Sequence, residues 1–266
     1  MTNNKLFYQA IKADKSDFKI WEKLENGCFI ATMNYSEENV PILMTLLQSF
    51  AEQYGEEITY ESASDELKLY TERGKLFLYL DENMNPVSMN GVTYNEDNVS
   101  VDFKSLDDKP VTSAYFYGLS TVHEYRGKGA CRTLINFAIN YAYANDYDVV
   151  YARTDLVNSN SEWIMQRAGM QICEDPEGII TEWVDVADGV GDYRLHLWLP
   201  LKEGLYLERK PAALNADSKT RKITAPNAKV LYKKANEQLH HFQHWVPVQY
   251  KKCAYNLSTF FNYLKQ

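Results

Sequence analysis

A short segment from Arg126 to Arg132 combines three basic side chains with two glycines in the order RGKGACR. It lies between an apolar run at 114–122, typical of a strand, and residues 130–145, whose apolar side chains recur at helical spacing. The first amides of a helix lack intrahelical acceptors and point, with the positive end of the helix dipole, at whatever lies in front of them. Glycines let such a backbone approach an anion closely. The segment is therefore predicted to be a phosphate-binding cradle.

Two common phosphate motifs are excluded. The chain has neither GxxxxGK[ST] nor GxGxxG at this junction, so the cradle is not a P-loop or a dinucleotide fingerprint. Taken alone, RGKG also fits a solvated basic turn, and the elements around it must decide between the two interpretations.

Hydrophobic periodicity predicts an alternation of strands and helices around the cradle. Residues 95–111 either extend a hairpin or form a loop, and 202–227 are predicted to be a connection. The predicted strands are 28–33, 75–80, 87–94, 114–122, 148–154, 170–174 and 193–201, and the predicted helices are 18–24, 39–54, 64–73 (capped by Ser64), 130–145 and 161–169.

This order of elements and the cradle together resemble the GNAT superfamily of acyl-CoA-dependent N-acetyltransferases. Arg126 and Gly129 match the first and fourth positions of its pyrophosphate loop, Q/R-x-x-G-x-G/A, and TVHEYRGKG at 121–129 is similar to its V-x-P-E-Y-R-G-K-G. The resemblance implies a mixed α/β (α+β) fold, with a mostly antiparallel central sheet, splayed parallel strands and flanking helices. It covers 28–201, with 1–27 as an N-terminal helical extension and 202–266 as a basic, largely helical C-terminal extension.

The resemblance also implies the reaction, in which an amine directly attacks the thioester of acetyl-CoA. The pantetheine would run between the strands at 114–122 and 148–154, and one backbone amide there would stabilise the oxyanion. The residues that the resemblance assigns to acetyl-CoA are Leu119, Ser120 and Thr121 along the strand, Arg126, Gly127, Lys128, Gly129, Ala130, Cys131 and Arg132 in the cradle, and Asn158 on the pantetheine arm.

The sequence departs from the family at the catalytic positions. Met165 stands where many members have a Tyr acid, and Arg153 where some have a Glu base. The predicted substitutes are Asp155, which shares a strand face with Arg153, and Tyr115 or Tyr117 on the neighbouring strand. Asp155 also fits a helix cap, each Tyr a core or substrate wall, and Arg153 either a salt bridge or a contact to a substrate carboxylate.

Cys131 and a pair of histidines in the C-terminal part of the chain are not predicted to act in catalysis or metal binding. Cys131 lies at a helix N-terminus, where a thiol pKa falls, although packing is a better interpretation than nucleophilic catalysis. His240 and His244 have metal-ligand spacing, but no acidic ligand stands nearby, so no metal site is predicted. The cysteines are scattered singly, which favours reduced thiols and a cytoplasmic protein.

Charge divides the chain into an acidic body and a basic tail. The first 201 residues carry 16 Lys and Arg against 32 Asp and Glu, whereas the last 65 carry 12 against 4. Apolar stripes in 228–266 predict two helices that pack on the body or across a homodimer, rather than on nucleic acid. No run is apolar enough for a membrane span.

Two functions follow from this sequence. The first is an N-acetyltransferase for a primary amine, in a small molecule or a peptide, whose acidic body attracts a cationic acceptor. The second is an acyl-CoA-binding regulator or scaffold that has kept the cradle, has lost the acid and base, and binds a partner through its tail.

Overall fold

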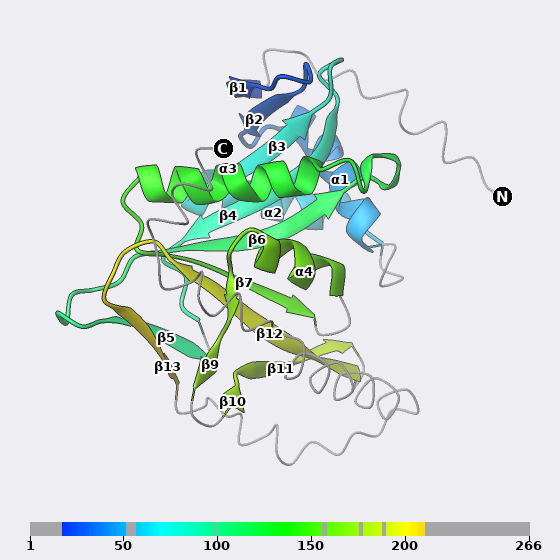
Figure 1. The fold of residues 1–266 in the computed structure, drawn as a ribbon. Coiled ribbons are helices and arrows are strands. Elements are labelled where there is room, and N and C mark those ends of the chain that lie inside the picture. Colours follow the sequence, from blue (N-terminus) through cyan, green and yellow to red (C-terminus); the bar gives the residue numbers. More distant parts are fainter. Residues whose placement is uncertain are drawn as a thin grey trace. The chain divides into compact units, whose positions relative to one another are not determined.

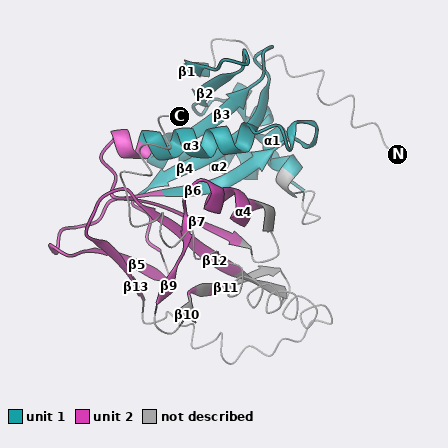
Figure 2. Cartoon of the chain, viewed as in Figure 1, with its two compact units in different colours: residues 1–94, 115–141 teal, residues 95–114, 142–266 magenta. Residues whose placement is uncertain are grey.

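The computed structural model describes residues 18–51, 57–98, 100–155, 159–175, 178–187 and 190–210. It divides into two compact units, Met1–Tyr94 with Tyr115–Tyr141 (unit 1) and Asn95–Ala114 with Ala142–Gln266 (unit 2), which Figure 2 distinguishes by colour. Each unit combines antiparallel strands with helices, as the predicted mixed α/β class requires. Among the described residues, no helix has the length and apolar character needed to cross a membrane.

Unit 1 contains one sheet with strands in the order β1-β2-β3-β4-β6 (Figure 1). The strands β1 to β4 pair antiparallel in sequence order. The strands are β1 Phe18–Lys23, β2 Phe29–Met33, β3 Gly74–Leu80, β4 Pro86–Tyr94 and β6 Ser113–Thr121, and the helices are η3 Glu37–Asn39, α1 Val40–Ala51, α2 Tyr60–Arg73, η4 His123–Tyr125 and α3 Ala130–Ala144. The first two residues of β6 and the last three of α3 belong to unit 2.

Helices cover both faces of this sheet. The Phe77 ring on β3 lies 5.5 Å from Phe137 and 5.2 Å from Tyr141, both on α3. The neighbouring register pair is Leu76 with Gly91, and a Cβ at Gly91 would overlap the Tyr70 ring of α2. Because successive strand residues point to opposite faces, α2 and α3 lie on opposite faces of the sheet.

The helix predicted at 18–24 is wrong, because these residues form the edge strand β1. A bulge between Ile20 and Glu22 interrupts the two-residue alternation, which makes the spacing of Phe18 and Trp21 look helical. The Trp21 indole donates to Thr32 Oγ1 at 2.9 Å on β2.

The helix predicted at 64–73 begins earlier than the sequence suggested. Thr59 caps α2 by accepting from the Ser62 amide at 3.1 Å, and the predicted cap Ser64 is buried inside the helix. Thr59 and Ser64 are both residue types that cap helices, so residue type alone does not indicate at which of them the helix begins.

Unit 2 contains the strands that follow α3 along the chain. β12 pairs antiparallel with β7, β11 and β8, while β5 pairs with β13 and β9 with β10. The elements are β5 Val101–Ser105, β7 Val149–Asp155, α4 Ser159–Arg167, β8 Gln171–Ile172, β9 Glu174–Asp175, β10 Gly178–Ile179, β11 Thr181–Ala187, β12 Val190–Pro200 and β13 Leu205–Arg209.

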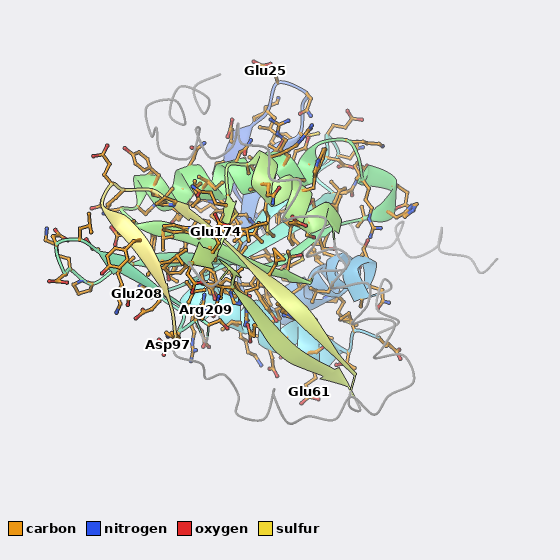
Figure 3. All side chains as sticks on the ribbon, turned by 60° about the horizontal axis from the view of Figure 1, so that its bottom comes forward. Glu25, Glu61, Asp97, Glu174, Glu208 and Arg209 are labelled. Carbon is orange, nitrogen blue, oxygen red and sulfur yellow. The ribbon has the colours of Figure 1, made fainter. Side chains whose placement is uncertain are left out.

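The hairpin-or-loop prediction for 95–111 and the connection predicted at 202–227 both missed a strand. β5 and β13 pair with each other, and Leu207 packs against a small core around Val101. Arg209, labelled in Figure 3, donates to both carboxylate oxygens of Asp175 at 2.8 and 2.9 Å. The body therefore extends to at least Lys210, while the predicted tail helices at 228–266 lie outside the described residues.

Candidate functional site

The predicted cradle has the backbone of an anion site. Gly127 and Gly129 adopt φ of +74° and +91°, a left-handed conformation that favours glycine. A Cβ added at either position would have no heavy atom within 4 Å, so the loop surface is open. The Thr133 amide donates to the Gly129 carbonyl at 3.0 Å, and the amides of Ala130 and Cys131 therefore lie in the first turn of α3.

The loop before the cradle is tied to the β3–β4 turn. The Tyr125 hydroxyl donates to Asp81 Oδ2 at 2.8 Å, and the Asn83 and Asn85 amides donate to Asp81 Oδ1 at 2.9 and 2.8 Å. Burial alone would raise the pKa of Asp81, but these hydrogen bonds outweigh it and lower that pKa. Lys128 Nζ lies 4.8 Å from the centroid of the Tyr125 ring. This cation–π contact keeps the positive charge of Lys128 beside the loop.

Arg126 has a positioning role within the cradle. Its guanidinium donates to the Thr121 carbonyl at 3.1 Å and to the Ser49 carbonyl at 2.8 Å. These contacts join the end of β6 to α1. Because both acceptors are neutral, the guanidinium charge is not cancelled by a carboxylate and still contributes to the field around Gly127.

Leu119, Ser120 and Thr121, which were predicted to pair with pantetheine, do not all present their backbone groups on the same edge of β6. The Val122 amide bonds to the β4 backbone at 3.0 Å, and the Ser120 carbonyl accepts from Ser88 of β4 at 2.8 Å. Backbone groups alternate between the two edges of a strand, so the backbone N–H and C=O of Leu119 and Thr121 point away from β4, while those of Ser120 point toward it. The Thr121 side chain still reaches β4, where its hydroxyl lies 2.8 Å from Ser88 Oγ.

Cys131 differs from the expectation for a thiol at a helix N-terminus. Burial raises its pKa to about 12, although a hydrogen bond with Thr121 acts in the opposite direction. Desolvation therefore dominates the pKa of this thiol, and the prediction of a lowered thiol pKa is wrong. The thiol is a packing group, as the sequence also suggested.

The predicted acid and base residues are only partly described. Tyr117 is 38% exposed and Tyr115 is buried, and their ring centroids lie 5.9 Å apart on β6. Asp155 ends β7, in register with Arg194, but its side chain lies outside the described residues, as does Asn158. The predictions for Asp155 and Asn158 remain predictions.

Arg153 is engaged in a salt bridge, one of its two interpretations from the sequence. Its Nη1 lies 3.0 Å from Glu182 Oε2 in unit 2. His196, opposite Arg153 in the β7–β12 register, is fully buried. Burial and the charges of Arg153 and Arg194 lower the pKa of His196 to about 3, so it is neutral at pH 7.

Two carboxyl groups, buried Glu162 and half-buried Glu66, were not predicted from the sequence. Glu162 on α4 is 3% exposed and accepts from Gln166 Nε2 at 3.0 Å, and burial raises its pKa to about 8. Glu66 on α2 accepts a hydrogen bond from the Tyr70 hydroxyl at 2.6 Å. The i, i+4 spacing of Glu66 and Tyr70 was readable, but their burial was not. Within the described residues, no group of His, Cys, Asp and Glu could hold a metal ion.

Comparisons with known proteins agree with this geometry. Residues 40–170 match the model of the Acetyltransferase (GNAT) family. The ribosomal-protein-S5-alanine acetyltransferase from Vibrio fischeri superposes with a TM-score of 0.51 and 14% identity, covering 70% of this chain and 98% of that chain. At that identity the likeness concerns the fold.

Two other solved structures are similar at lower scores. The GNAT-family acetyltransferase from Bacillus anthracis has a TM-score of 0.48 at 9% identity, covering 70% of this chain and 100% of its own. The ribosomal-protein-alanine N-acetyltransferase from Brucella melitensis has a TM-score of 0.48 at 15% identity, with coverages of 64% and 98%. No curated protein matches the sequence. The family model places the cradle and the strands around it in a GNAT domain, and residues 40–170 therefore belong to the acetyltransferase (GNAT) family.

Proposed function

We propose that the chain is an N-acetyltransferase that transfers the acetyl group of acetyl-CoA to a primary amine by direct attack. The observation that carries this proposal is the cradle inside the GNAT domain. Gly127 and Gly129 are exposed, left-handed and open at the N-terminus of α3, with basic side chains beside them. A pyrophosphate fits this combination of accessible amides, helix dipole and positive charge.

We assign the phosphates of acetyl-CoA to the backbone of 127–132, with Arg126, Lys128 and Arg132 supplying charge. The pantetheine arm would follow the edge of β6 that bears Leu119 and Thr121. Because the Thr121 carbonyl already accepts from Ser49 and Arg126, Leu119 offers the better backbone partner. Asn158 remains the proposed side-chain partner of that arm.

The chemistry requires an oxyanion donor and a proton acceptor. The Leu119 amide is the proposed donor to the thioester oxygen, a role worth about 3 to 4 kcal/mol in other acyl-transfer sites. An alkyl amine has a pKa of about 10.4 and is almost fully protonated at pH 7, so a base must take a proton before attack. The sequence candidates for proton transfer are Asp155, Tyr115 and Tyr117.

We propose that the acceptor is cationic, in a small molecule or a peptide, and that the protein is cytoplasmic. The acidic balance of the body supports the first point, since it raises the local concentration of cations. Cys28, Cys131 and Cys173 are free thiols, which supports a reducing compartment.

The test is a transfer screen in which the full chain and acetyl-CoA are incubated with a panel of primary amines and with peptides bearing free amino groups. Release of CoA thiol together with an acetylated product, found by mass spectrometry, is the expected result. Binding of acetyl-CoA with no transfer to any class of amine would support the non-catalytic regulator instead.

A further inference from the structure

Half-buried Glu66 and buried Tyr70 form a hydrogen-bonded pair that the predicted site does not use. They lie one turn apart on α2, and the Tyr70 hydroxyl donates to Glu66 Oε1 at 2.6 Å. Tyr70 is completely buried. Burial and the nearby Glu66 raise its pKa well above the usual value, so the phenol keeps its proton and acts as a donor.

Two glycines make room for this pair on neighbouring strands. A Cβ at Gly91 of β4 would overlap the Tyr70 ring, and a Cβ at Gly118 of β6 would overlap the Tyr70 hydroxyl. The same Cβ at Gly118 would lie 3.0 Å from Glu66 Oε1. The carboxylate and the phenol are therefore pressed directly against the backbone of β6.

Gly118 also marks an irregularity in β6. Its φ of +64° is left-handed, whereas a regular strand residue has negative φ. A left-handed glycine within a strand indicates a bulge, and bulges redirect side chains and are frequent beside active sites. The next residue is Leu119, the proposed donor to the thioester oxygen.

The proposed path of acetyl-CoA leads to this point. Its phosphates lie at the cradle, which follows β6, and its pantetheine arm runs back from Thr121 toward Leu119. With a strand rise of about 3.3 Å per residue, Gly118 lies about 10 Å along β6 from Thr121. The acetyl end of the arm thus approaches Glu66, while the phosphate end lies at α3.

We propose, on the basis of the acetyltransferase function above, that Glu66 is the catalytic residue that takes a proton from the acceptor amine, and that Tyr70 positions it. This assigns to Glu66 the role that the sequence suggested for Asp155. Exposed Tyr117, whose ring centroid is 6.1 Å from that of Tyr70, supplies an aromatic wall for the incoming ammonium.

The proton balance of the step is complete. The ammonium of the acceptor loses one proton to Glu66, which passes it to solvent. The neutral nitrogen then bonds to the acetyl carbon as the C–S bond breaks, and CoA leaves as a thiolate. The second amine proton goes to that thiolate, so the products are an amide, CoA thiol and one proton in solution.

The surroundings of Glu66 suit a proton acceptor. Burial raises the pKa of its carboxyl above the usual value, and the hydrogen bond from Tyr70 opposes that shift. The titratable groups of this cluster are Tyr70 on α2 and Tyr115 and Tyr117 on β6, while β4 presents uncharged Gly91 and Met89. A purely structural acceptor for the Tyr70 hydroxyl would not need a charge, and burying one is costly.

The experiment compares Glu66→Gln with Glu72→Gln, which alters an exposed glutamate on the same helix. We expect Glu66→Gln to lower kcat/KM at pH 7 by roughly 100-fold or more, as for other general bases, with acetyl-CoA affinity and melting temperature retained. The amide oxygen of the introduced glutamine can still accept from Tyr70, so the fold keeps this hydrogen bond. Glu72→Gln is expected to retain turnover.

The pH profile separates a base from a structural residue. The deficit of Glu66→Gln should shrink as the pH approaches about 10, because free amine then forms without a base. Tyr70→Phe removes a donor that stabilises the carboxylate, so the acid limb of its kcat/KM profile should move to higher pH.

If the wild-type chain acetylates an amine, either of two results would overturn the role of Glu66 and leave the proposed function intact. One is wild-type kcat/KM for Glu66→Gln at pH 7, and the other is a deficit that stays constant from pH 7 to 10. If the first result came with a large loss in Asp155→Asn, the role would return to Asp155. A wild-type chain that binds acetyl-CoA and acetylates no amine would instead overturn the proposed function and, with it, the role of Glu66.

Discussion

Replacing Gly129 with Glu tests the cradle directly, and the structure allows its two effects to be separated. The first effect is on folding. Gly129 has φ of +91°, and a non-glycine residue in the left-handed region costs about 1 to 2 kcal/mol. No atom lies within 4 Å of the added Cβ, so no steric cost is expected beyond this strain. The melting temperature should fall by about 2 to 8 °C.

The second effect is on acetyl-CoA binding. A carboxylate about 4 Å from a phosphate charge costs between about 1 kcal/mol in water and about 4 kcal/mol near a protein surface. Calorimetry should therefore find the Kd of acetyl-CoA raised by roughly 5-fold to 1000-fold, because each 1.4 kcal/mol is a factor of ten.

A matched control is Gly204→Glu in the β12–β13 turn. Gly204 is also left-handed, with φ of +74°, and its added Cβ would meet only ordinary contacts with Leu106 at 3.8 and 3.9 Å. This variant adds the same charge and similar strain, so its melting temperature should fall while its affinity for acetyl-CoA is retained. An unchanged Kd in Gly129→Glu would refute the assignment of the pyrophosphate to the cradle.

Three further predictions concern the rest of the chain. If the predicted tail helices pack on the body, truncation after Lys210 should lower the melting temperature by several degrees. Truncation after Leu201 should lower it further, because β13 is lost too. Identical melting curves for the full chain and both truncated chains would contradict this prediction. His196 has a pKa of about 3 in the folded chain against 6.5 in the unfolded chain, so the unfolded chain binds more protons between these values. The free energy of unfolding should therefore fall by up to about 1.4 kcal/mol per pH unit from pH 6 toward 3. Denaturant titrations at several pH values should find that this free energy depends less steeply on pH in His196→Gln. Cys131, with a pKa of about 12, should resist iodoacetamide at pH 8 in the native chain and react after unfolding, as mass spectrometry can follow.

The cradle could be predicted from the sequence because its determinants are local. Two glycines, three basic residues and the start of an amphipathic helix are contiguous, and their geometry depends on few distant contacts. The hairpin of β3 and β4 was predicted for the same reason, since its two runs, KLFLYL and VSMNGVTY, flank a short turn that contains Asn and Pro.

Strands that depend on a distant partner were harder to predict. β5 and β13 are five residues each and carry charged residues such as Asp102 and Glu208, so each alone resembles a loop. They become strands because each supplies the backbone partners of the other. β1 was misread for a related reason, since its bulge gives Phe18 and Trp21 a helical spacing that only pairing with β2 resolves.

The acid and base could not be read from motifs because the family positions carry Met165 and Arg153, and residue type no longer indicates the role. Glu66 lies in a helix whose sequence, YESASDELKLYTER, contains several carboxylates that pattern alone cannot rank. What distinguishes Glu66 is its place beside Gly118, a residue far along the chain at which a Cβ would lie 3.0 Å from Glu66 Oε1 and would overlap the Tyr70 hydroxyl. A proton acceptor is defined by its desolvation and its distance from the reacting atoms, and both are properties of packing between distant segments. A methyl group at Gly118 would overlap the Tyr70 hydroxyl and press on Glu66 Oε1, and no residue of the cradle is among its three nearest contacts. Gly118→Ala should therefore lower kcat by displacing the Tyr70–Glu66 pair, while calorimetry finds the Kd of acetyl-CoA largely unchanged.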